Sequence, residues 1–193
     1  SIEAGAGDDS LSISVLSGSS LKAGSGADTI NLSKAVSSQV YTNQDNDLII
    51  NSGDATTSTL SGGAGTDSIS IVGNVTGGQI VGNSGADSIT IAGTVNTAYV
   101  TGGADNDNMT LGAVVGGTVG GQYGADTLIV NGKVTGAQVL MTSATDPNSS
   151  SDLADSLSVG GSMSRSTGYA GAGADNISVD NHLIAGELFA GSG

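Results

Sequence analysis

Residues 63–71 read Gly63-Ala64-Gly65-Thr66-Asp67-Ser68-Ile69-Ser70-Ile71, a turn followed by a short strand. The two glycines permit a positive φ and let backbones approach each other closely. Ile69 and Ile71 are separated by one residue, so both point to the same face of a strand. Asp67 places a carboxylate beside the carbonyl groups of the turn. This stretch therefore predicts a turn that leads into a half-buried β-strand.

The same turn and strand recur along the whole chain, with an aspartate as the common reference point. The nine aspartates are Asp9, Asp28, Asp47, Asp67, Asp87, Asp107, Asp126, Asp155 and Asp175. Neighbouring aspartates are 19 or 20 positions apart, except Asp126 and Asp155, which are 29 apart. A short constant period is typical of repeat proteins. We expect residues 1–193 to form one solenoid segment with an inserted loop at 141–151, which contains the single proline.

Apolar residues follow each aspartate at offsets of two, four, eight and twelve or thirteen. In the repeat of Asp67 these residues are Ile69, Ile71, Val75 and Ile80, and in the repeat of Asp107 they are Met109, Leu111, Val115 and Val119. The offsets do not fit a helical period, and a meander of hairpins gives no reason for a constant repeat length. The pattern predicts an all-β, right-handed parallel β-solenoid of about nine coils, each of 19–20 residues and two strands, with a turn near Gly73-Asn74. At about 4.8 Å per coil, the rod would be roughly 43 Å long.

Two repeats depart from the pattern. In residues 43–47 both glycines are replaced by Asn and Asp, and the strand that follows has two possible registers, with either Leu48 and Ile50 or Ile49 in the core. In the repeat of Asp155, Leu153 stands where the second glycine is expected. We expect this turn to be distorted.

The charge of the chain is strongly acidic, with 4 Lys+Arg against 18 Asp+Glu and a formal net charge of −14. This excludes nucleic acid and anionic membranes as probable classes of partner. Most of the acids, including Asp8, Asp45 and Asp105, lie in or beside the repeated turns. Stacked turns would place these charges about 5 Å apart, where they repel one another unless a cation neutralises them. Alternatively, each aspartate accepts a hydrogen bond within its own turn and no ion is needed.

The sequence has no cysteine, no apolar run long enough to span a membrane and no signal peptide at its start. It begins inside one repeat and stops at Gly191-Ser192-Gly193, where the next turn is due. We expect it to be a segment of a longer array.

The turn and strand resemble the repeats-in-toxin (RTX) calcium-binding nonapeptide, Gly-Gly-x-Gly-x-Asp-x-apolar-x. Both glycines and the aspartate are present in the turns that end at Asp9, Asp28, Asp67 and Asp175. The resemblance covers essentially the whole chain and implies a calcium-stabilised β-roll. The metal ligands that it implies are the nine aspartates together with Gly5, Gly7, Gly24, Gly26, Gly63, Gly65, Gly85, Gly103, Asp105, Gly124, Gly171 and Gly173.

The chain differs from the standard RTX roll because only one half of each coil carries the aspartate motif. This predicts calcium ions, Ca²⁺, along a single edge of the solenoid. Such a roll looks like the ice-binding region of a bacterial RTX adhesin, in which Thr and Asn line the turns. The turns of this chain contain no comparable rank of Thr and Asn, so we do not expect ice binding.

The residues do not favour an enzyme. His182 is the only histidine, so a Ser/His/Asp triad could use no other, and we expect His182 to be a surface residue and neither a ligand nor a base. The carboxylates are spread over all coils and do not converge on one place, which disfavours a polysaccharide-active β-helix enzyme. We expect Tyr41, Tyr99, Tyr123 and Tyr169 to share no common offset from the aspartates and to be isolated packing residues.

The resemblance implies a rigid calcium-binding rod in a secreted bacterial surface protein, such as a surface-layer protein or an adhesin. Its location would be extracellular or on the cell surface. Its partners would be calcium and either copies of itself in a lattice or a cell-surface glycan, with no nucleic acid and no membrane insertion. The alternative is a metal-independent β-solenoid of a phage fibre or an extracellular filament.

Overall fold

The structure is a computed structural model that describes residues 1–142 and 153–190. Within these ranges the chain forms strands and no helix, so no apolar helix of membrane-spanning length is found there. Of the inserted loop expected at 141–151, only Met141 and Thr142 lie in the described ranges.

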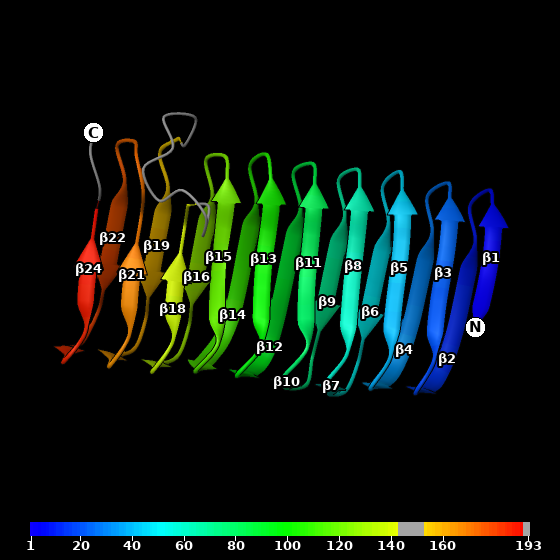
Figure 1. Cartoon of the computed structure of the whole chain (residues 1–193), viewed down its shortest axis with the longest axis horizontal. Coiled ribbons are helices and arrows are strands. Elements are labelled where there is room, and N and C mark those ends of the chain that lie inside the picture. The colour runs from blue at the N-terminus through cyan, green and yellow to red at the C-terminus, as the bar shows by residue number, and fades with distance from the viewer. Residues whose placement is uncertain (143–152, 191–193) are drawn as a thin grey trace.

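The strands form two parallel sheets that face each other across one core (Figure 1). Sheet A contains β1 (Ile2–Ala6), β3 (Ser20–Ser25), β5 (Gln39–Gln44), β8 (Thr59–Ala64), β11 (Gln79–Ser84), β13 (Tyr99–Ala104), β15 (Thr118–Tyr123), β18 (Gln138–Leu140), β21 (Thr167–Tyr169) and β24 (Glu187–Phe189). Sheet B contains β2 (Ser10–Ser17), β4 (Thr29–Val36), β6 (Leu48–Asn51), β7 (Ala55–Thr56), β9 (Ser68–Ile71), β10 (Val75–Thr76), β12 (Ser88–Asn96), β14 (Asn108–Val115), β16 (Thr127–Val130), β17 (Val134–Thr135), β19 (Ser156–Val159), β20 (Met163–Ser164), β22 (Asn176–Val179) and β23 (Leu183–Ile184).

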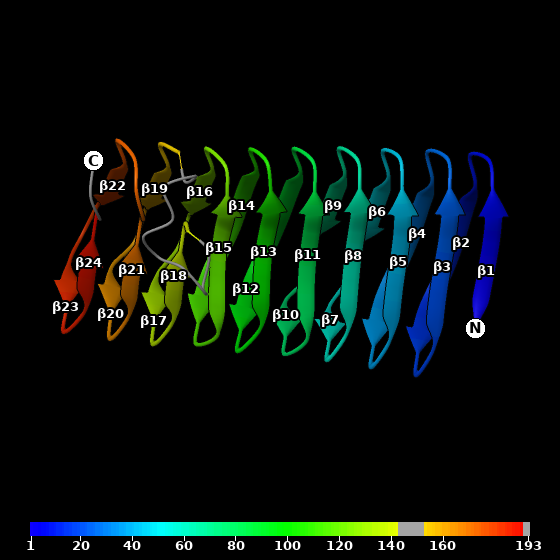
Figure 2. The ribbon, with the colours of Figure 1, turned by 45° about the horizontal axis from the view of Figure 1, so that its top comes forward.

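Each strand pairs with the equivalent strand of the next coil, so the chain forms a parallel β-solenoid as predicted. The first coil lies at one end of the rod and the last coil at the other, and the winding in Figure 1 is right-handed. Figure 2, which is turned by 45°, shows the two sheets as separate layers joined by a corner at each end of the strands. Some coils have two strands as expected, whereas others have three because their sheet B strand is interrupted.

One of the two chain reversals of a coil, the glycine turn before each aspartate, lies where it was predicted, and the other does not. Gly73-Asn74 only bends the chain between β9 and β10, after which Val75 returns to the core. The reversal into sheet A comes at Gly77-Gly78, where φ is 61° and 74°. The first of these two positions has a positive φ in every coil, and its occupants are Gly18, Ser37, Thr57, Gly77, Thr97, Gly116, Gly136, Arg165 and Ala185. The sequence gives little sign of this corner because most of these residues are not glycine.

The core consists of aliphatic ranks that run along the rod axis. Ile69, Ile71, Val75 and Ile80 are all buried, which confirms the predicted offsets. The prediction of Val115 was wrong, because this side chain is 43% exposed and Val114 is buried in its place. The register of β14 against β12 shifts at the bend, which removes one residue from this coil and brings Val114 opposite Val95.

The ambiguous register of the third repeat is resolved in favour of Ile49, which is buried opposite Ile30 and Ile69. Two residues further on, Asn51 faces the core between Leu32 and Ile71 and is fully buried. Its amide nitrogen donates a 2.9 Å hydrogen bond to the carbonyl of Gly53, whereas its Oδ1 has no hydrogen-bond partner. In the last coil, Leu183 is 45% exposed, so its predicted core role is not confirmed.

Candidate metal-binding ladder

The nine repeated aspartates lie inside the solenoid, at the corner where each sheet A strand leads into sheet B. Asp67, Asp87 and Asp107 expose 2–3% of their surface, and only Asp9 and Asp175, in the end coils, are partly exposed. Alternation explains this position, because an aspartate two residues before a core residue such as Ile69 points to the same side of the chain. The glycine turn brings each carboxylate over the end of the apolar core.

The aspartates are joined in a ladder that has one direction. The backbone N–H of each aspartate donates to Oδ1 of the aspartate in the next coil, at 2.7–3.0 Å from Asp9 to Asp175. The backbone carbonyl of each also accepts from the next coil, as in the 2.9 Å bond from Ser88 N–H to the Asp67 carbonyl. The alternative in which each aspartate accepts a hydrogen bond within its own turn is therefore wrong, because Oδ1 accepts from the neighbouring coil.

In seven of the nine aspartates of the ladder, the second carboxylate oxygen, Oδ2, is buried and lacks a hydrogen-bond donor. This holds for Oδ2 of Asp9, Asp28, Asp47, Asp67, Asp87, Asp107 and Asp175. A buried carboxylate oxygen without a partner is unstable as an anion. The ladder thus requires either a proton or a cation beside Oδ2.

A rank of small residues makes room for Oδ2. A Cβ built on Gly82 would lie 2.2 Å from Oδ2 of Asp87, and one on Gly102 would lie 2.1 Å from Oδ2 of Asp107. The same rank, five residues before each aspartate, contains Gly62 and Gly121 in neighbouring coils, and Ala23 and Thr42 nearer the N-terminus. Sequence reasoning did not select this rank as part of the site. The signal was the first glycine of the Gly-Gly-x-Gly-x-Asp pattern, which several repeats retain.

Burial is the main cause of the pKa shifts in the ladder. Loss of solvent raises the pKa of Asp67 to about 6, of Asp87 to about 7 and of Asp107 to about 8, and the pKa of Asp47 is also raised. Hydrogen bonds from backbone N–H groups partly oppose this shift. The repulsion between neighbouring carboxylates adds to it. Without a cation, burial therefore favours the protonated form most strongly at Asp107 and Asp87, in the middle of the ladder.

The glycines predicted around the aspartates have the expected backbone conformation. All of them have φ between 102° and 137°, and they are Gly5, Gly7, Gly24, Gly26, Gly63, Gly65, Gly85, Gly103, Gly124, Gly171 and Gly173. A side chain would also be excluded by the preceding coil, because a Cβ on Gly63 would lie 2.2 Å from the carbonyl oxygen of Asn43. In other coils these positions hold Asn43, Asp45 and Asp105, with φ of 80°, 71° and 75°.

Asp8, Asp45 and Asp105 do not lie in the buried ladder. All three are exposed on the outside of the turns. Asp8 accepts a 2.9 Å hydrogen bond from the backbone N–H of Ala27, and Asp45 accepts a 3.0 Å bond from Gly26. The acidic turns thus divide into a buried inner column and an exposed outer row, and the single column expected from the sequence is wrong. The predicted metal ligand Asp105 lies in the outer row.

The donor chemistry of the inner column fits a hard divalent cation. Such ions take carboxylate and carbonyl oxygens as ligands, and the column supplies buried Oδ2 atoms beside a glycine-rich backbone. Among residues 1–142 and 153–190, no three Asp, Glu or His side chains converge as a metal-binding group. A cation here would take one or two carboxylates from adjacent coils, and its other ligands would be carbonyl oxygens or water.

His182 is exposed, as expected. Tyr41 and Tyr169 share an offset of six residues before an aspartate, so the expectation of no common offset was wrong.

Comparisons of the chain with protein-family models, with curated proteins and with solved structures found no match.

Proposed function

We propose that this chain is a calcium-binding structural segment that acts as a rigid rod in an extracellular bacterial surface protein. The observation that carries the proposal is the column of buried aspartates whose Oδ2 atoms lack a donor. Aspartates of this kind occur in coils along the rod, from Asp9 to Asp175, which suits a series of ions better than a single site. The resemblance of the turns to RTX repeats supports calcium in particular, since the column is made of oxygen ligands.

Calcium would couple binding to folding. A cation beside Oδ2 supplies the positive charge that the buried carboxylates lack, and it is held only when the coils are stacked. Binding to the folded state alone raises the free energy of unfolding. Calcium in the millimolar range outside a cell would then keep the rod folded.

A metal-independent solenoid is the second candidate, and the raised pKa values of Asp67, Asp87 and Asp107 favour it. In that case the carboxyl groups stay neutral and the ladder is stable without an ion. The chain would then serve as a filament or fibre segment that does not respond to calcium.

A calcium titration at pH 8 followed by circular dichroism distinguishes the two candidates. We expect calcium to raise the melting temperature, EDTA to reverse the change and magnesium at the same concentration to have a smaller effect, because Mg²⁺ demands near-ideal octahedral geometry. An unchanged melting temperature throughout the titration would exclude the calcium function and leave the metal-independent solenoid.

A further inference from the structure

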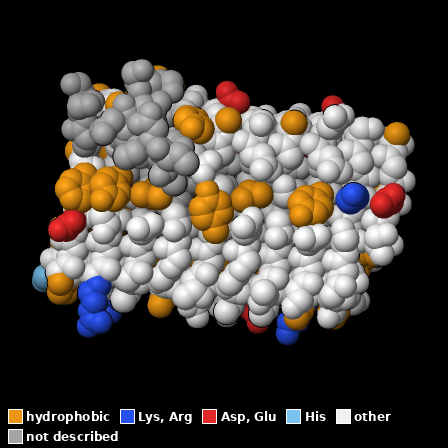
Figure 3. All heavy atoms as spheres, viewed as in Figure 1, with side chains coloured by type: hydrophobic (Ala, Val, Ile, Leu, Met, Phe, Trp, Pro, Cys, Tyr) orange, Lys and Arg blue, Asp and Glu red, His pale blue; other side chains and the backbone are white. Residues whose placement is uncertain are grey.

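We propose that the outer face of sheet A binds an uncharged linear polysaccharide, which lies along the rod axis on a row of apolar and aromatic side chains. This apolar row consists of Tyr41, Val81, Tyr99, Leu140, Tyr169 and Phe189. Figure 3 shows hydrophobic side chains in a band along the long axis of this face. Binding of such a partner does not depend on whether a cation or protons neutralise the buried aspartates.

Strand register brings most of the row into line. Tyr41 pairs with Ser61, Val81 with Ser61 and Thr101, and Tyr169 with Leu140 and Phe189. Tyr99 lies two residues before Thr101 on β13 and reaches the row from the side. The prediction that the tyrosines are isolated packing residues is wrong for Tyr169, whose ring stacks on that of Phe189.

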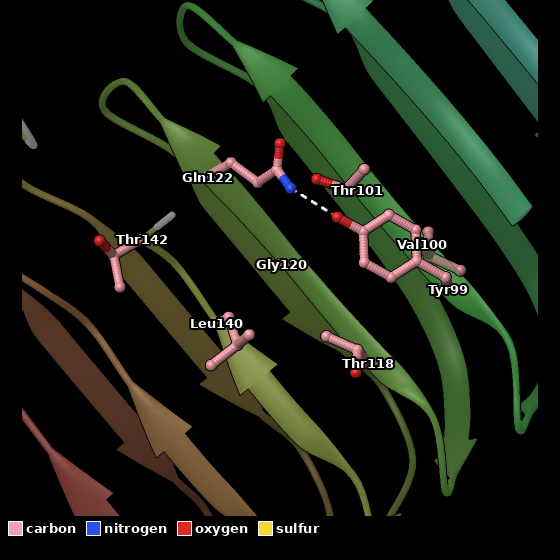
Figure 4. A pocket seen from close by; sticks show the side chains of 8 residues that line it. All are labelled: Tyr99, Val100, Thr101, Thr118, Gly120, Gln122, Leu140 and Thr142. Carbon is pink, nitrogen blue, oxygen red and sulfur yellow. Dashed lines mark hydrogen bonds between the residues drawn. The ribbon is translucent and has the colours of Figure 1, made fainter. Parts of the chain in front are cut away.

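The row presents flat rings with hollows between them. The rings of Tyr169 and Phe189 are stacked, with centroids 4.8 Å apart and planes at 9°. Ser61 and Thr101 have small side chains, and only 8% and 5% of their surface is exposed. The surface of the row is therefore lower at these two positions. Tyr99, Gly120 and Leu140 are among the residues that line a further hollow of about 10 Å³, and Figure 4 shows how these residues lie. This hollow holds about one water molecule or one small ligand group.

Amide side chains flank the row at positions where the backbone favours glycine. Asn43, Asn83 and Gln122 have φ of 80°, 86° and 96°, and the equivalent residues in other coils include Gly24, Gly63 and Gly103. A non-glycine residue with this φ costs about 1 kcal/mol or more. Such strain is often retained for function, so these amides call for an explanation beyond folding.

Two of the amides reach the row itself. Asn83 Nδ2 donates a 2.8 Å hydrogen bond to Ser61 Oγ, and Gln122 Nε2 donates to the hydroxyl of Tyr99 (Figure 4). The other flank holds Thr59, Gln79, Thr118 and Gln138. An apolar strip bordered on both sides by amides and hydroxyls matches a sugar chain, which presents C–H groups on its ring faces and hydroxyls at its edges.

The charge and the width of the apolar row favour a neutral polysaccharide over an acidic glycan or a second copy of the chain. The face carries no charged residue in the apolar row from Tyr41 to Tyr169, while the net charge of the chain, −14, repels acidic glycans. A stable contact with a second copy buries about 800 Å² per partner around an apolar centre. A strip one residue wide with polar borders suits a single extended chain better.

Affinity electrophoresis in saturating calcium tests the proposal on the folded chain. We expect hydroxyethylcellulose or linear dextran in the gel to retard the chain, and polygalacturonate not to. Tyr41→Ala and Tyr169→Ala should each weaken binding about twofold to twelvefold, since an aromatic contact of this kind is worth about 0.5–1.5 kcal/mol. Tyr123→Ala is the matched control, because Tyr123 is 41% exposed at the end of β15 and lies outside the row.

Gln122→Gly separates a binding role from a structural role. It removes the amide and relieves the positive φ, so we expect an equal or higher melting temperature together with weaker retardation. No retardation by either neutral polymer, retardation by polygalacturonate alone, or an equal loss in Tyr123→Ala would overturn the proposal. Self-association that Tyr169→Ala abolishes, without glycan binding, would identify a second copy as the partner. The calcium titration is read independently, so either proposal can fail while the other stands.

Discussion

The backbone N–H of Asp67 donates a 2.8 Å hydrogen bond to Oδ1 of Asp87, and both residues are buried. Oδ2 of Asp87 has no donor. The two oxygens of the Asp87 carboxylate thus have different roles. Oδ1 links neighbouring coils through a hydrogen bond, and Oδ2 is available to a proton or a cation.

Asp87→Asn and Asp87→Ala should separate these tasks. The asparagine variant can keep an acceptor for the Asp67 N–H, so we expect it to fold without metal at least as stably as the parent at pH 8, and to bind calcium more weakly. The alanine variant leaves a buried N–H unpaired, which costs about 1–3 kcal/mol of unfolding free energy. Urea unfolding with and without calcium measures both effects. Asp54→Asn is the control, since Asp54 lies outside the ladder on an exposed bend; a calcium effect of equal size there would contradict this assignment.

The stability of the metal-free chain should depend on pH in an unusual direction. The pKa values of Asp67, Asp87 and Asp107 are raised in the folded state to about 6, 7 and 8. The folded state therefore binds protons more tightly than the unfolded state, whose aspartates have pKa values near 3.9. The stability that these protons provide is fully present below about pH 4 and is lost as pH rises to about 8.

Melting temperatures measured in EDTA across this pH range test the prediction. We expect the highest value at the acidic end, apart from any effect of groups outside the ladder, and a smaller pH dependence in Asp107→Asn. Saturating calcium should flatten or reverse the trend, because a cation favours the ionised carboxylates. A melting temperature in EDTA that rises steadily with pH would show that the carboxyl groups are ionised in the metal-free fold.

Asp67→Ala should lower calcium affinity more than Asp155→Ala. Asp67 follows a turn with both glycines, whereas Leu153 replaces the second glycine before Asp155. Isothermal titration calorimetry of the two variants gives the comparison, with matched unfolding curves to confirm that both remain folded. Equal losses would indicate that the glycines do not shape the ion site.

Gly63→Ala should be far more destabilising than Gly136→Ala, although both glycines have positive φ. A Cβ on Gly63 would lie 2.2 Å from a backbone oxygen of the preceding coil, whereas a Cβ on Gly136 meets nothing within 4 Å. Equivalent positions of Gly136 already hold Thr57 and Ala185 at φ of 48°. We expect a loss of about 3 kcal/mol or more for Gly63→Ala and about 1 kcal/mol or less for Gly136→Ala. Similar losses in urea unfolding would show that φ alone decides.

Asn51→Val should stabilise the chain by about 1 kcal/mol. The side chain is fully buried in an aliphatic rank between Leu32 and Ile71, and its Oδ1 lacks a partner. Replacement by an apolar group of similar size removes the cost of burying this oxygen. Asn31→Val on the outer face of the neighbouring coil is the control, and it should leave stability nearly unchanged. Destabilisation by Asn51→Val would mean that the bond from its amide to Gly53 is needed at the bend.

The repeat period made the fold predictable, because a residue such as Ile69 has the same surroundings in every coil. The burial of Asp67 was implicit in the same alternation, since it lies two residues before Ile69. The details that escaped prediction depend on three-dimensional register. Val115 lost its core position to Val114 through one missing residue at a bend, and the corner at Gly77 is marked by conformation more than by composition. The apolar row consists of side chains from separate coils, and it becomes visible in the sequence only when positions are compared relative to the aspartate of each coil.

Each inner coil offers an N–H to the coil after it and an Oδ1 to the coil before it. The joints between coils are therefore interchangeable at this corner, and removing or duplicating one full period would recreate the same joint. Rod length can change only in whole steps of about 4.8 Å. The length of such a solenoid can thus be changed, by evolution or by engineering, through the number of repeats alone, and the contacts between coils stay the same.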